Sequence, residues 1–168
     1  MKKFQYLILL NAMCIVLSAC IKTHVEPNLP AETQSGKNTF GCRVNGKIWV
    51  AEAPFPISRL TGGWYKGSLN IYGIKKKDNT SQHIYIRRVK TTAVGTYILN
   101  NSDTEQVHFS DLSINCDYYT DSLNTGHLTI TRLDTINGII SGRFDFKVKQ
   151  TGCPDIEVTE GRFDYNYH

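Results

Sequence analysis

The sequence predicts an all-β domain, an antiparallel β-sandwich of about nine or ten strands. Short runs rich in β-branched and aromatic residues alternate with period two along the chain after Cys20. Asn, Asp, Ser, Thr and Gly residues separate these runs at the spacing that is usual for antiparallel strands. No stretch after Cys20 has the apolar period of a helix, which disfavours a parallel sheet with crossover helices. The alternative is a lipocalin-like β-barrel, which would enclose a ligand cavity.

The N-terminus has the pattern of a bacterial lipoprotein signal. Two lysines precede an apolar run from Phe4 to Leu17, which is shorter than the roughly 20 residues that a membrane-spanning helix needs. The sequence Leu17-Ser18-Ala19-Cys20 resembles a lipobox, in which cleavage precedes the cysteine and the thiol takes a diacylglycerol. We therefore expect residues 1–19 to be a signal peptide and Cys20 to be lipidated.

The segment that follows has the composition of a linker. Residues 21–38 contain two prolines and few large apolar residues, so we expect residues 20–38 to form a flexible tether. Residues 39–168 are long enough for a single domain with its own core. Neither Ile21 nor Lys22 is the aspartate that retains some lipoproteins in the inner membrane. The expected location is the outer membrane, on its periplasmic face or at the cell surface.

The strands can be assigned in order from the alternation. The first two, at residues 39–44 and 47–51, flank Asn45-Gly46, the strongest short signal for a tight hairpin. Eight further runs are expected at residues 64–74, 83–89, 94–100, 106–110, 113–119, 127–133, 141–149 and 156–167.

The last two of these runs share a Gly-Arg-Phe-Asp-aromatic motif, in SGRFDF at residues 141–146 and EGRFDY at residues 160–165. The alternation places aromatic residues on the core face and Arg and Asp on the solvent face of each run. A slip of phase near Gly161 predicts a β-bulge. We interpret the pair as a C-terminal hairpin with cross-strand Arg–Asp pairs, and disfavour an adhesive tag because alternation buries Phe144 and Phe163.

Three cysteines, Cys42, Cys116 and Cys153, remain in the domain. In an oxidising compartment they allow one disulfide, with three pairings, and the alternative is three inert thiols. No C-x-x-C spacing supports a zinc or redox motif, and no two histidines have metal-ligand spacing. We expect no metal and no cofactor.

Neither catalytic motifs nor charge suggest an enzyme or a nucleic-acid-binding protein. The chain lacks G-x-S-x-G, H-E-x-x-H and a phosphate-binding glycine loop, so we expect no enzyme. Without Lys2 and Lys3, 17 of the 19 basic residues remain against 15 acidic ones, a net charge of +2. Nucleic acid is not an expected partner because phosphate binding needs a concentrated basic face.

Aromatic side chains are the candidate binding residues. Seven lie in or beside predicted strands, where aromatic rings can stack on sugars or anchor a protein partner: Trp49, Trp64, Tyr65, Tyr72, Tyr85, Tyr118 and Tyr119. Of these, Trp49, Trp64 and Tyr65 are the candidate binding residues that we select. Core packing and cross-strand pairing are the alternative roles. The basic run Lys75-Lys76-Lys77 is interpreted as a solubilising turn that protects a strand edge.

The two ends of the domain resemble a known family. NTFGCRVNGKIWVAE at residues 38–52, with GHLTITRLDTINGIISGRFDF and VTEGRFDYNY within residues 126–167, is similar to small lipoproteins of unknown function common in Bacteroidetes-type bacteria. The resemblance implies a secreted, anchored, all-β domain and provides no catalytic residues. We expect a lipid-anchored envelope protein that acts as a non-catalytic binding or interaction module for a glycan or a protein. The alternatives are a structural subunit of an envelope or surface assembly and, if the fold is a barrel, a carrier of a small apolar ligand.

Overall fold

A computed structural model describes residues 28–100 and 105–168. The expected signal peptide, Cys20 and the first part of the expected tether lie outside these residues. Within them, no helix is long and apolar enough to cross a membrane.

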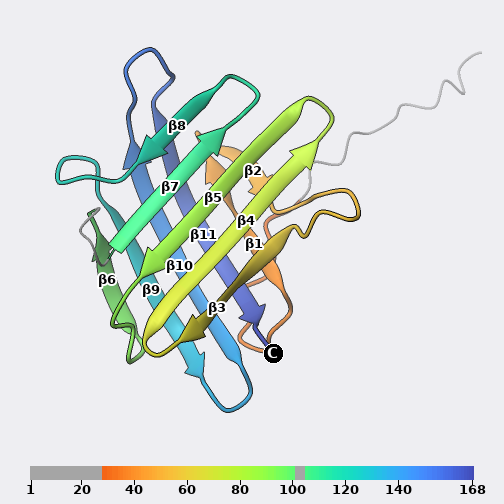
Figure 1. The fold of residues 1–168 in the computed structure, drawn as a ribbon, viewed down its shortest axis with the longest axis vertical. Coiled ribbons are helices and arrows are strands. Elements are labelled where there is room, and N and C mark those ends of the chain that lie inside the picture. The colour runs from red at the N-terminus through yellow and green to blue at the C-terminus, as the bar shows by residue number, and fades with distance from the viewer. Residues whose placement is uncertain (1–27, 101–104) are drawn as a thin grey trace, which may run out of the picture.

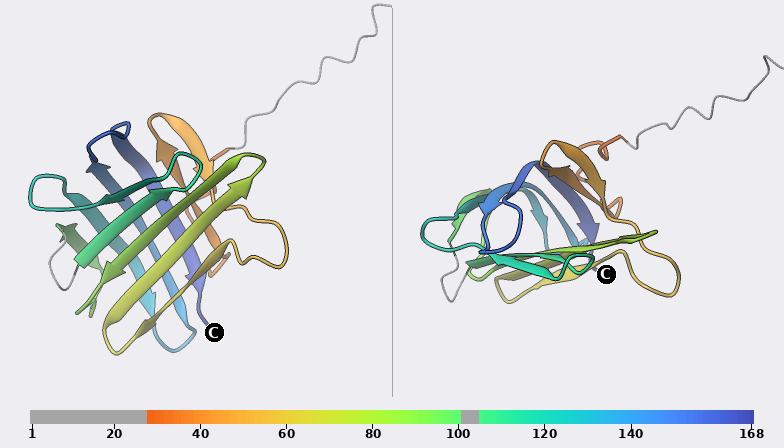
Figure 2. Two further views of the ribbon diagram at one scale, coloured as in Figure 1. Left: turned by 45° about the horizontal axis from the view of Figure 1, so that its top comes forward. Right: turned by 90° about the horizontal axis from the view of Figure 1, so that it is seen from above.

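The domain is a sandwich of two antiparallel sheets (Figure 1). The six-stranded sheet has the order β2-β1-β11-β10-β9-β6, and the five-stranded sheet has the order β3-β4-β5-β7-β8. The strands are β1 (Thr39–Val44), β2 (Lys47–Val50), β3 (Leu60–Tyr65), β4 (Ser68–Lys77), β5 (Thr80–Arg88), β6 (Gly95–Leu99), β7 (Glu105–Asp111), β8 (Cys116–Tyr119), β9 (Gly126–Asp134), β10 (Ile139–Val148) and β11 (Ile156–Asn166). Figure 2 shows the sheets as two stacked layers. The predicted sandwich is confirmed, and the barrel alternative is wrong.

Turn chemistry explains most of the strand boundaries. Asn45 and Gly46 adopt φ values of 48° and 77°, as the predicted hairpin between β1 and β2 requires. The expected run at residues 64–74 is two strands, because Lys66 and Gly67 also have positive φ values and reverse the chain between β3 and β4. This division brings the described strands to eleven.

The core fills the space between the sheets. Its largest fully buried side chains come from both layers, with Phe40, Trp49 and Phe146 on the six-stranded sheet and Phe109 and Tyr118 on the five-stranded sheet. Full burial of an aliphatic or phenylalanine side chain stabilises a fold by about 1.5–3 kcal/mol, so this apolar interface is the main source of stability.

The repeated motif is explained by the pairing of β10 with β11. Gly142 lies opposite Phe163, and Phe144 lies opposite Gly161, so each glycine faces the phenylalanine of the other copy. A Cβ atom added to Gly142 would lie 2.8 Å from the Phe163 ring, and one added to Gly161 would lie 2.5 Å from the Phe144 ring. The glycines therefore make room for the two rings.

The predicted bulge near Gly161 is confirmed. Two residue steps on β10, from Phe144 to Phe146, match three steps on β11, from Gly161 to Val158. The residue with positive φ is Glu160, at 50°, and not the glycine beside it.

The predicted Arg–Asp pairs across this hairpin do not form. Arg143 lies directly opposite Arg162, and the two like charges are each paired elsewhere. Arg143 contacts Glu32 at 2.5 Å, and Arg162 lies 3.6 Å from Glu160. Asp164 is not on a solvent-exposed face as expected, because it is 1% exposed beneath residues 33–37.

One disulfide joins the two sheets. Cys116 at the start of β8 is bonded to Cys153 in the turn between β10 and β11, with a Cα–Cα distance of 6.1 Å. Of the three pairings that the sequence allows, the structure contains this one. Cys42 is a free, buried thiol, and its burial raises its pKa well above the ordinary value.

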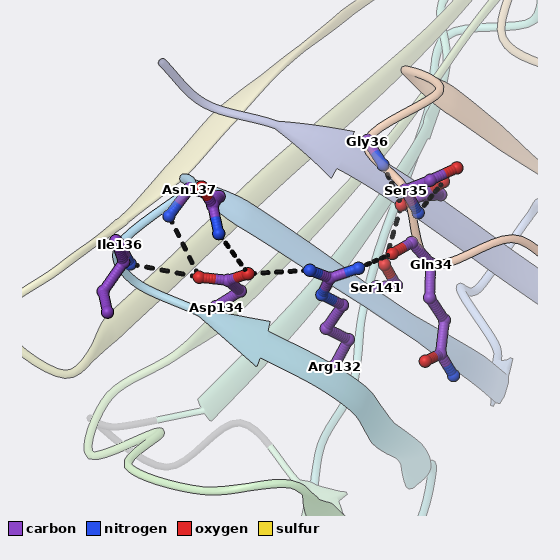
Figure 3. Close-up of polar contacts among 9 residues, drawn as sticks. Gln34, Ser35, Gly36, Arg132, Asp134, Ile136, Asn137 and Ser141 are labelled. Atoms are coloured by element: carbon purple, nitrogen blue, oxygen red, sulfur yellow. Dashed lines mark hydrogen bonds and ion pairs between the residues drawn. The ribbon is translucent and has the colours of Figure 1, made fainter.

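Residues 28–38, which we call the strap, lie along the outer face of the six-stranded sheet. This differs from the expected flexible tether. The carboxylate of Asp164 accepts hydrogen bonds from Thr33 Oγ1 (2.6 Å), Ser35 N (3.0 Å), Gly36 N (2.8 Å), Lys37 N (3.0 Å) and Ser141 Oγ (2.7 Å). Figure 3 shows Arg132 donating both to the Gln34 carbonyl and to Asp134, which adds a further attachment for the strap.

Candidate functional site

Four rings form a line across the outer face of the five-stranded sheet. Tyr72 on β4 pairs with Tyr85 on β5, Tyr85 pairs with His108 on β7, and His108 pairs with Tyr119 on β8. We call these four residues the aromatic row. Since neighbouring strands are about 4.8 Å apart, the row spans about 14 Å. The row forms because the register of the strands places these four outward-facing residues directly opposite one another.

The rings are held by contacts with one another and with their neighbours. The centroids of Tyr72 and Tyr85 lie 6.2 Å apart with their planes at 66°, and those of His108 and Tyr119 lie 4.4 Å apart at 3°. The Tyr85 hydroxyl donates to Asn70 Oδ1 at 2.8 Å. The Tyr72 hydroxyl is 2.7 Å from His83 Nδ1. Fixed rings lose little side-chain entropy when a ligand covers them.

Polar side chains run along both sides of the aromatic row. On one side, Asn70, Arg87 and Gln106 occupy the outward positions of successive strands. On the other side lie His83, Ser110 and Asp117. A ring platform bordered by hydrogen-bonding groups offers apolar contact in the middle and polar contact at its rim.

One contact between the row and its rim is a short hydrogen bond. His108 Nε2 lies 2.9 Å from Asp117 Oδ1, and hydrogen bonds from His108 and Ser110 lower the pKa of Asp117. Burial lowers the pKa of His83, and the nearby His108 and Lys76 lower it further. The imidazole of His83 therefore favours its neutral form, in which one ring nitrogen accepts a hydrogen bond.

The aromatic row is accessible to a ligand. In Figure 1 the five-stranded sheet faces the viewer, and no other described segment crosses its outer face. Tyr72, Tyr85 and His108 are half-buried in the face, and Tyr119 is 46% exposed. The strap lies on the opposite side of the sandwich, over the six-stranded sheet (Figure 2).

The three aromatic residues selected from the sequence do not form a common site. Trp49 is 1% exposed in the core, and its indole N–H donates to Gln82 Oε1 at 3.0 Å, so it is not a surface binding residue. Trp64 is half-buried against the core and donates to the Thr91 carbonyl at 2.8 Å. Tyr65 is 71% exposed near the hairpin that joins β3 to β4.

The sequence analysis did not select the aromatic row as a site, although alternation gives part of the signal. In HIYIRRV the isoleucines and Tyr85 take opposite parities, which predicts that Tyr85 points outward. Whether outward-facing residues of neighbouring strands align depends on how the strands are paired in register. The sequence alone does not give that register.

The three histidines of the described strands are divided between the two sheets. His83 and His108 lie on the five-stranded sheet, whereas His127 lies on the six-stranded sheet and contacts Asp145 at 2.9 Å. Over residues 28–100 and 105–168, no group of three or more His, Cys, Asp and Glu side chains is arranged to hold a metal ion.

The region of the chain that forms the sandwich matches a known protein family. Residues 38–165 match the family described as a domain of unknown function, DUF6252. The chain belongs to this family. The matched range includes the whole sandwich up to Tyr165 and nearly all of the two segments that carried the resemblance, whereas the strap precedes it except for Asn38. No curated protein and no solved structure has a significant match to this DUF6252 chain.

Proposed function

We propose that this DUF6252 protein is a lipid-anchored envelope protein that binds a glycan, without catalysis, through the aromatic row. The observation that carries the proposal is the alignment of Tyr72, Tyr85, His108 and Tyr119 across four adjacent strands. Sugar rings present C–H faces that pack on aromatic rings and hydroxyls that bond to polar side chains. The row and its polar rims provide both kinds of contact.

The shape of the site favours an extended saccharide over a small solute. The rings lie on an open sheet face and not in a closed cavity, and about 14 Å of platform corresponds to several sugar units. An open platform binds a chain along its length, and each ring adds a contact.

The membrane anchor is the second part of the proposal. The lipobox ending at Cys20 supports acylation of this cysteine and location in the outer membrane. Replacement of Cys20 by Ser should release the protein from the membrane fraction and remove the acyl mass from its N-terminal peptide. Protease treatment of intact cells will then distinguish the cell surface from the periplasmic face.

Affinity electrophoresis through gels that contain soluble polysaccharides tests the glycan site. We expect at least one polysaccharide to retard the wild-type protein, and the Tyr85→Ala variant to bind about tenfold more weakly, which corresponds to about 1.4 kcal/mol. Tyr65→Ala is the matched control, because it removes a tyrosine that is more exposed but lies off the row.

Two results would reject the glycan site. Retardation that depends on Tyr65 and not on Tyr85 would place binding elsewhere on the surface. Absence of retardation in all polysaccharides, together with a cross-linked protein partner on the same face, would favour a subunit of an envelope assembly.

A further inference from the structure

A groove lies at the end of the sandwich beside the turns that follow β1, β7 and β10; the turns after β7 and β10 are at the top of Figure 1. We call it the end groove. Its volume is about 410 Å³, within the range that is usual for small-molecule sites. Its walls come from both sheets, including Thr80 at the start of β5, and from the turns after β1, β7 and β10, which contribute Asn45, Ile114 and Pro154.

Lys75 is the unusual residue in this groove. The core-facing positions of β4 before it are Leu69, Ile71 and Gly73, all of them buried, and Lys75 takes the next position on the same face. Its ammonium group has one weak contact, with the Ile48 carbonyl at 3.5 Å. In the part of the chain that the structure describes, no carboxylate lies within ion-pair distance of Lys75.

The neighbouring lysines behave differently. Lys77 lies 3.0 Å from Glu52, and Lys76 takes the outward position on β4 and is exposed. Lys75 is half-buried, so its ammonium group lies at the border of the groove, where water or an anion can satisfy its charge. Lys75 therefore presents a positive charge to the groove, which an anion from outside the domain can contact.

Three other polar side chains of the end groove, those of Trp49, Gln82 and Asp111, are linked by hydrogen bonds. Trp49 Nε1 donates to Gln82 Oε1 at 3.0 Å, and Gln82 Nε2 donates to Asp111 Oδ2 at 2.6 Å. The second oxygen of Asp111 accepts the Ser113 N–H at 3.0 Å. These bonds hold the Asp111 carboxylate away from Lys75 and leave the lysine free to bind an anion.

The remaining wall of the groove is apolar. Val44, Ile114, Pro154 and Ile156 line it, and Ile114 is 52% exposed. Lys47 also borders the groove and adds a second positive charge. A ligand that complements this surface has a carboxylate at one end and a short apolar body.

We propose that the end groove binds a small organic carboxylate, with the carboxylate at Lys75 Nζ and the apolar body against the wall formed by Ile114 and Ile156. This site is independent of the aromatic row, which lies on the outer face of the five-stranded sheet. Charge complementarity favours a ligand with a carboxylate, because Lys47 and Lys75 both border the groove. Asp111, the one carboxylate among the residues that line it, is bonded to Gln82.

Trp49 is buried directly beneath the groove, and its indole N–H bonds to Gln82, another residue that lines it, so its fluorescence can report a ligand bound there. The full-length protein carrying Trp64→Phe, which removes the other indole, is titrated with octanoate and with octanol, which differ only in the head group. We expect octanoate to bind at least tenfold more tightly than octanol. Lys75→Met should abolish this preference, and Lys76→Met, the outward-facing control, should retain it.

The proposal is overturned if octanoate and octanol bind equally, if neither binds, or if Lys75→Met and Lys76→Met behave alike. Lys75→Gln keeps a polar head, so it serves as the second variant should the methionine variant unfold, and near-UV circular dichroism checks the fold of each. Saturable binding of octanoate that is lost in both Lys75 variants supports the site.

Discussion

Replacement of Asp164 by Asn should detach the strap from the six-stranded sheet. The carboxylate accepts four hydrogen bonds from residues 33–37 and one from Ser141, and three of the four from the strap come from backbone N–H groups. An asparagine has nearly the same shape, but its NH₂ group would face N–H donors. The substitution therefore replaces accepted hydrogen bonds with opposed donors in a site that is 1% exposed.

The magnitude follows from the pKa of the buried carboxyl. Burial acts to raise the pKa of Asp164, but hydrogen bonds from Thr33, Lys37, Ser141 and Gly36 outweigh it and lower the pKa from 3.8 to about 2. A difference of this size corresponds to about 2.5 kcal/mol of stabilisation by the ionised form. With the opposed donor included, we expect Asp164→Asn to lower the free energy of unfolding by about 3 kcal/mol at pH 7.

The pH dependence has a defined sign. Because the folded-state pKa lies below the unfolded-state value, the stabilisation is complete above about pH 4.5 and is lost as the pH falls toward 2. The difference in unfolding free energy between the wild type and Asp164→Asn should therefore shrink over this interval. Urea unfolding at pH values from 7 to 2 measures it, and limited trypsin digestion at Lys37 reports release of the strap.

Asp145 provides the matched control, since it is the aspartate of the other motif copy and its carboxylate is exposed beside His127. Asp145→Asn should change the free energy of unfolding by less than about 1 kcal/mol. Equal unfolding free energies for Asp164→Asn and the wild type at pH 7, with Lys37 equally protected, would refute the reasoning.

Three further outcomes test the packing. Gly161→Ala places a Cβ 2.3 Å from a backbone carbonyl oxygen of the facing strand, so urea unfolding should show that the free energy of unfolding falls by more than about 2 kcal/mol. Gly46→Ala is the control: its Cβ meets nothing within 4 Å, so it should cost only about 1 kcal/mol of backbone strain. Replacing both Cys116 and Cys153 by Ser should lower stability by about 2–4 kcal/mol in the same assay, because the bridge closes a long loop. Cys42, whose thiol pKa is raised by burial, should react with a thiol reagent at pH 8 only after unfolding; rapid reaction in the native protein would contradict its placement.

Alternation and turn chemistry were sufficient to predict the sandwich. Asn45-Gly46 located the first hairpin, and the parity of SGRFDF identified the core face of β10. Both features depend on residues close together in the sequence. The division between β3 and β4 was missed because a lysine, Lys66, supplies a left-handed position that is more often filled by Gly or Asn.

The strap, like the two candidate sites, depends on contacts between distant segments, and the sequence contains little signal for these. Thr33, Ser35 and Gly36 have the composition of a linker, and only their approach to Asp164 gives them a structural role. The two motif copies contain identical Arg-Phe-Asp triplets, yet one aspartate is buried and the other exposed. Which of them is covered depends on where the strap crosses the sheet.

The strap also determines how the domain responds to a mechanical load. If Cys20 is anchored in a membrane, tension on the chain reaches the bonds between the strap and Asp164 before it reaches β1. Detachment of residues 28–37 would free a segment whose fully extended length is about 35 Å while the sheets stay paired. Under force the strap would detach first and could rebind, while the sandwich would remain folded.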